Sequence, residues 1–282
     1  MTDFDPRITP ARPDLAAAHL RDEISADKYV EADAYQVSAG VAAVRSSPAD
    51  DAIMVSQALL GERVDLYEIR EGWGWCQLVR DGYVGWLDMA TLSAPAIEPT
   101  HRVSALRTYV FSEPDLKSPP RFLASLTSEI AATDRDGNWV KADRGGWLFV
   151  DHLAPLSVFA DDFVAVAEQF VGAPYLWGGK ESLGLDCSGL VQTALAAAGV
   201  AAPRDSDMQE AAIGAPISHA ADLSNLQRGD LVFWRGHVGV MIDEKHLLHA
   251  NAHHMATAIE PLVQTVERLT PAVGPIRSVR RL

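Results

Sequence analysis

The chain has 282 residues and a formal net charge of −14, from 24 Lys and Arg against 38 Asp and Glu. Such an acidic surface disfavours nucleic acid and anionic membranes as partners, although it does not oppose a small peptide bound in a local pocket. The length predicts two or three domains, and the sequence has no apolar run long enough to span a bilayer.

Residues 1–35 are predicted to form an extension that packs on the core. They contain several prolines and a helix-like run over 14–24. The N-terminus has neither a basic segment nor an apolar segment, so no signal peptide is expected. Only Cys76 and Cys187 are present, in different predicted domains, so no disulfide is expected. These features predict a cytoplasmic protein, in which a reduced thiol can work.

Residues 36–156 consist of short β-like runs and turns, and two stretches repeat one pattern. Each stretch has two tryptophans on successive predicted strands and a leucine at the same distance after the second tryptophan. This repeat predicts two small all-β barrels, over 36–95 and 100–156, with the tryptophans in their cores. The paired tryptophans are Trp75 with Trp86 and Trp139 with Trp147.

Residues 157–282 are predicted to form one α+β domain. An amphipathic helix is expected over 161–171, with Asp161 as its N-cap and Gly172 as its stop. The segment that follows, around Tyr175, contains proline and glycines and is expected to form an extended loop.

Cys187 is predicted to begin a helix, because the apolar residues after it recur at helical spacing until Gly199. A thiol at a helix N-terminus feels the positive end of the helix dipole, which lowers its pKa. Because the thiolate is the reactive form, this position suits a nucleophile. The alternative is a buried structural cysteine, which is common for an isolated free cysteine.

Two histidines lie on predicted strands after this helix. His237 begins a β-like run directly after a glycine turn, and His249 lies in the next run. On adjacent antiparallel strands, residues so spaced can lie side by side, so His249 is expected to hold the tautomer of His237, the base for Cys187. The alternative is a metal site, which is disfavoured because no carboxylate or cysteine lies at ligand spacing. The clustered histidines are His246, His249, His253 and His254.

The series of motifs from residue 163 to the C-terminus resembles the NlpC-type cysteine peptidases that cut bacterial cell-wall peptides. The resemblance implies a papain-like α+β fold in which Cys187 is the nucleophile, His237 the base and His249 the orienting residue. It also implies that Tyr175 and the backbone N–H of Cys187 face the developing oxyanion. The two barrels resemble bacterial SH3-like domains, which often precede such peptidases. The matching motifs are PYLWGG at 174–179, LDCSGL at 185–190, RGDLVF at 228–233, GHVG at 236–239 and LHA at 248–250.

A finer resemblance is to the subgroup that cuts after γ-linked D-glutamate. It implies substrate contacts from the segment 203–206, in which Arg204 offers a planar fork for a carboxylate and Ser206 a further donor. Asp186 would meet a free substrate amine. Asp205 or Ser206 is also expected to cap a helix, and both roles can hold together. The full expected substrate-binding set in this domain is Asp186, Ser188, Arg204, Asp205 and Ser206.

In this subgroup the first barrel leans over the active site. The resemblance therefore makes Tyr83 and Trp86 candidates for a substrate-facing wall, although both are equally expected as barrel core. Glu62 and Asp51 are the acidic candidates from the same barrel.

The predicted function is a cysteine endopeptidase that cleaves the bond between γ-D-glutamate and the diamino acid of short murein peptides beginning with L-alanine. Without an export signal, it would act on wall fragments taken back into the cell. No cofactor or metal is expected, and the partner is the small peptide itself. Two alternatives remain: a broader murein hydrolase or amidase acting on intact peptidoglycan, and a non-catalytic wall-binding module. Intact Cys187, His237 and His249 argue against the second alternative.

Overall fold

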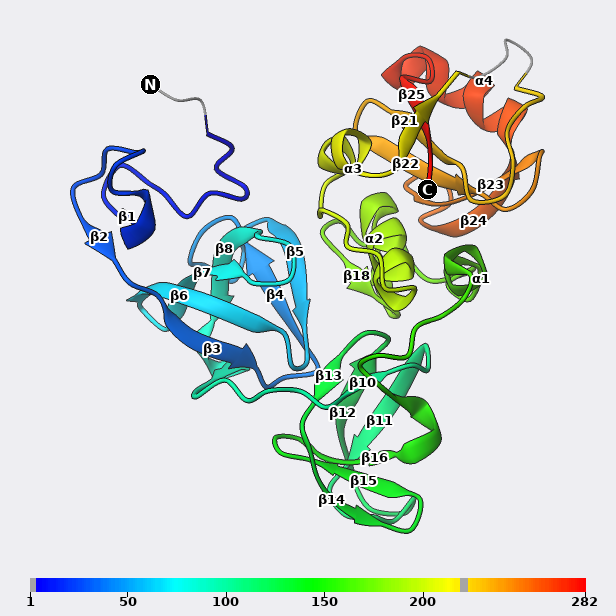
Figure 1. Cartoon of the computed structure of the whole chain (residues 1–282). Coiled ribbons are helices and arrows are strands. Elements are labelled where there is room, and N and C mark those ends of the chain that lie inside the picture. The colour runs from blue at the N-terminus through cyan, green and yellow to red at the C-terminus, as the bar shows by residue number, and fades with distance from the viewer. Residues whose placement is uncertain (1–3, 219–222) are drawn as a thin grey trace. The chain divides into compact units, whose positions relative to one another are not determined.

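The computed structural model describes residues 4–218 and 223–282. The first three residues of the predicted N-terminal extension lie outside the described part. The chain divides into two compact units, Met1–Ser157 and Val158–Leu282. Strands dominate the first unit, whereas the second combines helices with a sheet (Figure 1). In the part of the chain that is described, no helix is long and apolar enough to cross a membrane.

The N-terminal extension does not form the helix predicted over 14–24. It has two short parallel strands, β1 (Ala16–Ala17) and β2 (Tyr29–Val30), with the 3-10 helix η1 (Ala18–Leu20) between them. The N–H groups of the two β1 residues donate to the carbonyls of Lys28 and Pro10, so hydrogen bonds to distant residues replace helical ones. The apolar side chains around β1 pack against Tyr67 of the first β domain.

The first β domain is a seven-stranded antiparallel sheet with the order β5-β4-β8-β7-β6-β3-β9. The inward residues of its strands form one apolar core, which contains Val44, Leu66 and Leu87 and also the fully buried Cys76. A 3-10 helix, η2 (Met89–Thr91), connects its last two strands. The strands are β3 (Asp33–Val37), β4 (Val41–Arg45), β5 (Met54–Leu59), β6 (Arg63–Arg70), β7 (Trp73–Leu78), β8 (Val84–Asp88) and β9 (Leu92–Ser93).

The second β domain contains a five-stranded sheet, β12-β11-β16-β15-β14, and a three-stranded sheet, β13-β10-β17. Its core contains Val103, Val110 and Leu148. The 3-10 helix η3 (Val150–His152) precedes its last strand. The strands are β10 (His101–Val103), β11 (Arg107–Phe111), β12 (Pro120–Ser125), β13 (Glu129–Ile130), β14 (Ala132–Asp136), β15 (Trp139–Ala142), β16 (Gly146–Phe149) and β17 (Leu153–Pro155).

The two β domains share one strand order once β13 and β14 are treated as two halves of β6. Their backbone hydrogen bonds agree as well. The N–H of Val37 donates to the Glu62 carbonyl over 2.9 Å, and the N–H of Val103 donates to the Ser128 carbonyl over 2.8 Å. The repeat seen in the sequence therefore extends to topology and to individual backbone contacts.

The alignment of the repeat differs from the predicted one by two residues. Trp86 pairs with the last residue of β4, and Trp147 pairs with the last residue of β11, so these two tryptophans correspond. Trp139 then corresponds to Trp73 and not to Trp75, because each pairs with the residue two positions after the corresponding tryptophan. The β7–β8 and β15–β16 hairpins have loops of different length, so matching the tryptophans in the sequence aligned Trp139 with the wrong residue.

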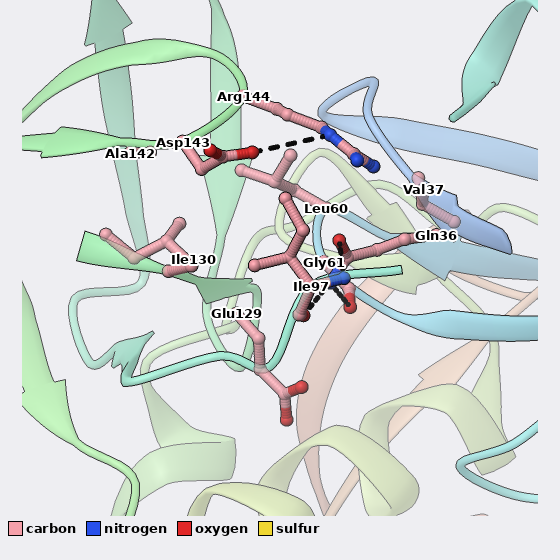
Figure 2. A pocket seen from close by; sticks show the side chains of 11 residues that line it. Gln36, Val37, Leu60, Gly61, Ile97, Glu129, Ile130, Ala142, Asp143 and Arg144 are labelled. Atoms are coloured by element: carbon pink, nitrogen blue, oxygen red, sulfur yellow. Dashed lines mark hydrogen bonds and ion pairs between the residues drawn. The ribbon is translucent and has the colours of Figure 1, made fainter. Parts of the chain in front are cut away.

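The two β domains contact each other within the first unit. A cavity of about 20 Å³ is lined by residues of both domains, and beside it the side-chain amide of Gln36 donates to the carbonyls of Gly61 in its own domain and of Ile97 in the linker (Figure 2). Arg80 of the first domain bridges Glu62 of the same domain and Glu129 of the second domain. Glu62 is thus a buried partner of Arg80, and this ion pair explains a charged residue at that position without a contact to substrate.

The second unit begins with a shorter helix than predicted. Helix α1 (Phe163–Glu168) is capped by Asp162, whose carboxylate accepts from the N–H of Val164 over 2.8 Å, so the cap lies one residue after the predicted Asp161. The chain leaves the helix through turns and reverses at Gly172, where φ is +85°. The predicted stop at Gly172 was wrong, because the helix already ends at Glu168 with Gln169 as its C-cap, and Gly172 instead allows a left-handed turn beyond it.

A six-stranded antiparallel sheet forms the body of the second unit, with the order β20-β25-β21-β22-β23-β24. Helix α2 (Cys187–Ala197) packs on β22 and β23, and helix α4 (Leu262–Val273) packs on β23 and β24. Helix α3 (Ser206–Ala212) and the two-stranded β18 (Lys180–Glu181) and β19 (Gly184–Leu185) complete it. The sheet strands are β20 (Ala215–Ile217), β21 (Leu231–Trp234), β22 (His237–Met241), β23 (His246–Asn251), β24 (Ala256–Pro261) and β25 (Ser278–Arg281).

Candidate active site

Cys187 is the first residue of α2, as the sequence predicts. Asp186 caps this helix, with its carboxylate accepting from the N–H of Gly189 over 2.8 Å. The helix ends before Gly199, where φ is +79°. The cap residue and the terminal glycine therefore hold the cysteine at the N-terminal end of a helix that packs on the sheet.

The protonation state of Cys187 differs from the prediction. Burial, and next the neighbouring Asp186 carboxylate, raise the pKa of the Cys187 thiol to about 12. Hydrogen bonds from the backbone N–H groups of Val238 and Ser188 lower the pKa, as does Arg204, but they do not compensate. The predicted low pKa was wrong because desolvation of a thiol that is only 7% exposed outweighs the helix dipole. The resting cysteine is a neutral thiol, which needs a base to become a nucleophile.

His237 and His249 form a direct hydrogen bond. Strands β21 and β22 are joined by a two-residue hairpin in which Trp234 pairs with His237, and Gly236 supplies the positive φ of +72° that the turn requires. His249 lies on the adjacent strand β23, and its Nδ1 is 2.8 Å from Nε2 of His237. The predicted contact between the two imidazoles is therefore confirmed, and it leaves Nδ1 of His237 outside this bond.

A carboxylate that the sequence analysis missed continues this chain. Oε2 of Glu260 lies 2.6 Å from Nε2 of His249, and Oε1 lies 3.1 Å from Nε2 of His254. Arg268 of α4 also contacts the same carboxylate. No carboxylate was expected at ligand spacing from these histidines, but the β23–β24 hairpin pairs His249 with Ala258 and so brings Glu260 onto the same face. The hairpin register was the signal that would have found it.

These contacts do not amount to a metal centre. Among residues 4–218 and 223–282, no group of three His, Cys, Asp or Glu side chains is arranged to hold a metal ion. Two of the four clustered histidines bind Glu260, and His246 instead contacts Asp243 over 2.8 Å.

Burial keeps the two central imidazoles neutral. Burial, and next the neighbouring His249, lower the pKa of His237 to about 3. Burial also lowers the pKa of His249, against the opposing effect of Glu260. At neutral pH the resting His237 ring is therefore unprotonated and has a lone pair available, while the same burial makes it a weaker base than an exposed histidine.

Tyr175 lies close to the cysteine. Its backbone N–H donates to the Met255 carbonyl over 2.9 Å, and it bridges to Leu185 just before the helix. Burial raises the pKa of the Tyr175 hydroxyl, and the neighbouring Cys187 raises it further. The phenol stays protonated and is a hydrogen-bond donor near the thiol. Its role at the oxyanion remains a prediction.

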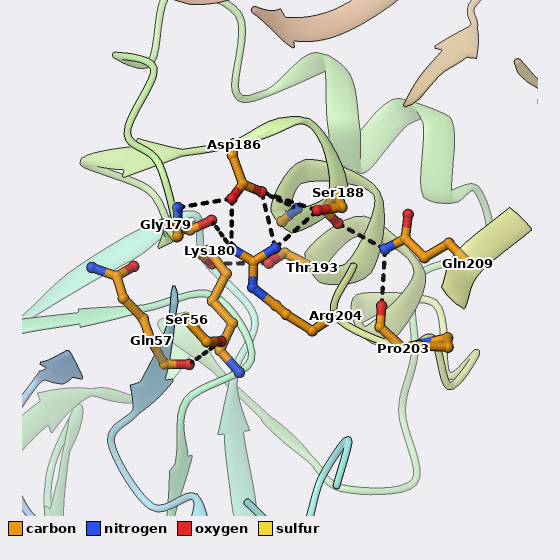
Figure 3. A network of polar contacts seen from close by, with 12 residues as sticks. Ser56, Gln57, Gly179, Lys180, Asp186, Ser188, Thr193, Pro203, Arg204 and Gln209 are labelled. Carbon is orange, nitrogen blue, oxygen red and sulfur yellow. Dashed lines mark hydrogen bonds and ion pairs between the residues drawn. The ribbon is translucent and has the colours of Figure 1, made fainter. Parts of the chain in front are cut away.

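Asp186 and Arg204 form a buried ion pair (Figure 3). The two terminal nitrogens of Arg204 lie 3.0 Å and 2.7 Å from the two carboxylate oxygens, and one of them donates to the Ser188 hydroxyl over 2.9 Å. Asp186 also accepts from the N–H of Gly178. Arg204 is 1% exposed.

This geometry gives Arg204 and Asp186 a structural role, and the substrate contacts expected of them remain predictions. The fork of the guanidinium already binds a carboxylate of the protein, and the carboxylate that was expected to meet a substrate amine is the one it binds. The pair holds the start of α2 against the loop before α3. Ser188 belongs to the same network and is 5% exposed.

The remaining predicted substrate residues fall into two groups. Asp205 occupies the N-cap of α3 without a capping hydrogen bond from its side chain, and Ser206 is the first helical residue. Their substrate contacts remain predictions. Tyr83 and Trp86 are 5% and 6% exposed. Tyr83 packs in the first β-domain core and Trp86 packs beneath Arg12 of the extension, and their role as a substrate-facing wall remains a prediction.

A thiol at the start of a helix, with a hydrogen-bonded histidine pair on the neighbouring sheet, defines the class of protein: a cysteine peptidase. Residues 172–267 match the model of the NlpC/P60 family, and residues 44–92 match the model described as bacterial dipeptidyl-peptidase Sh3 domain. The chain therefore contains an NlpC/P60 cell-wall peptidase domain, with its papain-like fold, and a bacterial SH3 domain, as the sequence motifs predict.

Similar proteins agree with this assignment. A Lysinibacillus sphaericus protein named dipeptidyl-peptidase 6 is 35% identical over 111 residues, which are 38% of this chain and 40% of that protein. A Bacillus subtilis protein named gamma-D-glutamyl-L-lysine dipeptidyl-peptidase is 27% identical over 77% of this chain and 78% of that one. The crystal structure of an NlpC/P60 family protein from Bacillus cereus has a TM-score of 0.73 at 21% identity, over 88% of this chain and 99% of that chain. The last similarity shows that the fold is shared. The chain spans about two fifths of the length of the Lysinibacillus relative.

Proposed function

We propose that the protein hydrolyses the bond between γ-D-glutamate and the diamino acid in short murein peptides that begin with L-alanine. The observation that carries the reaction type is the hydrogen bond between His237 and His249 beside the buried thiol of Cys187. The names of the two similar proteins, a dipeptidyl-peptidase 6 and a γ-D-glutamyl-L-lysine dipeptidyl-peptidase, support the substrate class.

In the proposed reaction, Nδ1 of His237 takes the proton from the Cys187 thiol as the sulfur attacks the γ-carbonyl of D-glutamate. The oxyanion accepts hydrogen bonds from the Tyr175 hydroxyl and the backbone N–H of Cys187. The imidazolium of His237 then gives its proton to the departing amine of the diamino acid, and the C–N bond breaks. Water, deprotonated by His237, hydrolyses the thioester and releases the dipeptide with the free thiol.

This mechanism suits the neutral resting state of the site. Because the pKa of Cys187 is raised and that of His237 is lowered, an ion pair is disfavoured before substrate binds. Proton transfer then accompanies the attack, as in the serine enzymes, and the base must already hold the correct tautomer.

The second β domain is proposed to be a second SH3-like domain. Its strand order and its backbone hydrogen bonds repeat those of the first β domain, which matches the SH3 model. An experimental structure of the chain in which β13 and β14 did not follow the course of β6 would contradict this assignment.

The cellular role is proposed to be the recycling of wall peptides in the cytoplasm. Both cysteines are free thiols, so the fold requires no oxidising compartment. Fractionation of cells producing the full-length protein tests the location, and recovery of the protein outside the cytoplasm would exclude this role while leaving the chemistry intact.

The decisive experiment is mass spectrometry of products from a defined set of substrates. The set contains L-Ala-γ-D-Glu peptides with lysine or diaminopimelate, each with a free or an acetylated N-terminus, and intact peptidoglycan. We expect the free peptides to be cut after γ-D-glutamate and the Cys187→Ala variant to be inactive. Efficient cleavage of capped peptides and of intact peptidoglycan would favour the broader hydrolase, and no cleavage of any substrate would favour a binding module.

A further inference from the structure

Glu260 ends the chain of hydrogen bonds that begins at His237. It lies on β24, next to β23, and its side chain is only 14% exposed. Three groups from different elements face its carboxylate: His249 on β23, His254 in the turn after β23, and Arg268 on α4. This concentration of partners on one carboxylate next to a catalytic histidine calls for a functional explanation.

We propose that Glu260 is a positioning residue, which selects the tautomer of His249 and through it the tautomer of His237. The inference rests on the proposed peptidase function, and it extends that function to a fourth residue beyond the cysteine and the two histidines.

The argument follows from which atoms can donate a hydrogen. An ionised carboxylate only accepts, so the 2.6 Å contact requires the proton of His249 to be on Nε2. Nδ1 of His249 then has a lone pair, and the 2.8 Å contact requires Nε2 of His237 to be the donor. The remaining nitrogen of His237, Nδ1, has the lone pair that takes the thiol proton.

The opposite tautomer would disable the base. If Nδ1 of His249 carried the proton, it would donate to Nε2 of His237 and the proton of His237 would lie on Nδ1. The pKa of Glu260 is lowered to about 2, first by the hydrogen bond from His249, so the carboxylate remains an acceptor at every pH at which the enzyme would work. Arg268 and His254 hold the carboxylate in place, and Arg268 compensates its charge.

The test uses two variants of the full-length protein and a matched control. Glu260→Leu removes every acceptor at nearly the same size, and Glu260→Gln keeps one acceptor but removes the charge. Glu267→Gln makes the same chemical change at an exposed position of the adjacent helix α4. Nitrogen-15 NMR of the imidazoles reports the tautomer, and kinetics with the free wall peptide report the consequence.

We expect wild type and Glu267→Gln to carry the His249 proton on Nε2. In Glu260→Leu this preference should be lost, with kcat reduced about 10- to 100-fold and KM little changed, which is less than the roughly 10⁴-fold loss when the direct partner of a triad base is replaced. The kcat of Glu260→Gln should lie between those of wild type and Glu260→Leu. This variant keeps the test valid if the leucine variant does not fold.

Two outcomes would overturn the proposal: a wild-type His249 protonated on Nδ1, or a folded Glu260→Leu variant with unchanged tautomer and kcat. The spectroscopic result does not depend on turnover. If Cys187→Ala retained full activity, the proposed function would fail while the tautomer assignment could still be read, so the two failures are distinguishable.

Discussion

Two buried polar networks flank Cys187, and they differ in how they end. The Asp186–Arg204 network is closed, since both carboxylate oxygens and both terminal guanidinium nitrogens bind other groups of the protein. The His237–His249–Glu260 network is linear. Its hydrogen bonds run from Glu260 through His249 to Nε2 of His237, and Nδ1 of His237 takes no part in them. A closed network fixes the positions of its side chains. In a linear network the position of the proton on one ring also sets its position on the next.

This difference means that the same kind of mutation should have different consequences on the two sides. Changes in the linear network should lower kcat more than they lower the free energy of unfolding. Changes in the closed network should lower stability first, because they leave a buried charge without its partner.

The largest effect is expected at the residue between the networks. Cys187→Ala should lower kcat by roughly 10⁶-fold, the scale of removing the nucleophile of a catalytic triad. The free energy of unfolding should change little, because the helix cap and the Asp186–Arg204 pair remain. Urea unfolding monitored by circular dichroism is the control, and measurable turnover by a well-folded variant would rule out Cys187 as the nucleophile.

The next effect concerns the linear network. His249→Ala should lower kcat by about 10²–10⁴-fold, because His237 loses the group that orients it. His249→Asn should retain more activity, since the amide oxygen can still accept from Nε2 of His237. Exhaustive chelation should leave the wild-type rate unchanged. A chelator-sensitive wild type would instead support a metal at this histidine cluster.

The closed network is tested by Arg204→Met with Arg228→Met as its counterpart. Arg204→Met should lower the free energy of unfolding by about 3–5 kcal/mol, because Asp186 is left buried and unpaired. Arg228 makes equally short contacts with Asp162 and Glu168, but its side chain is 39% exposed, and its loss should cost at most about 1 kcal/mol. An Arg204→Met variant of normal stability but greatly raised KM would show that Arg204 acts on the substrate and not on the fold.

The smallest effect is expected from pH. The pKa of His237 is lowered to about 3 by burial, below the value near 6.5 of an unfolded histidine. The neutral base is therefore retained as pH falls through 6.5, and kcat/KM of wild type should change less than about twofold between pH 7 and pH 5.

The free energy of unfolding should also depend on the titration of His237. The contribution of neutral His237 is present above pH 6.5 and is lost as pH falls toward 3.

An acid limb of kcat/KM centred near pH 6.5 would show that His237 titrates as an exposed histidine and would contradict its burial in the free enzyme.

Local patterns allowed the position of the reacting groups to be predicted from the sequence. A cap residue, an apolar helical period and a terminal glycine define α2, so Cys187 had to stand at its start. Two short β-like runs with a glycine turn define the strands that carry His237 and His249. These signals lie within a few residues of the groups they position, which is why they were readable.

The charge state of the site was decided only by tertiary structure. The partner of Arg204 lies 18 residues away, so neither its pairing with Asp186 nor its burial could be read from a motif that fits a substrate carboxylate equally well. Glu260 reaches His249 through the register of a hairpin, and the raised pKa of Cys187 depends on how completely the sheet covers the thiol. The sequence determined where the cysteine and the two histidines lie on the helix and the strands, because helices and strands are encoded locally. Only packing decided which of them are left to act, because burial and pairing depend on the whole fold.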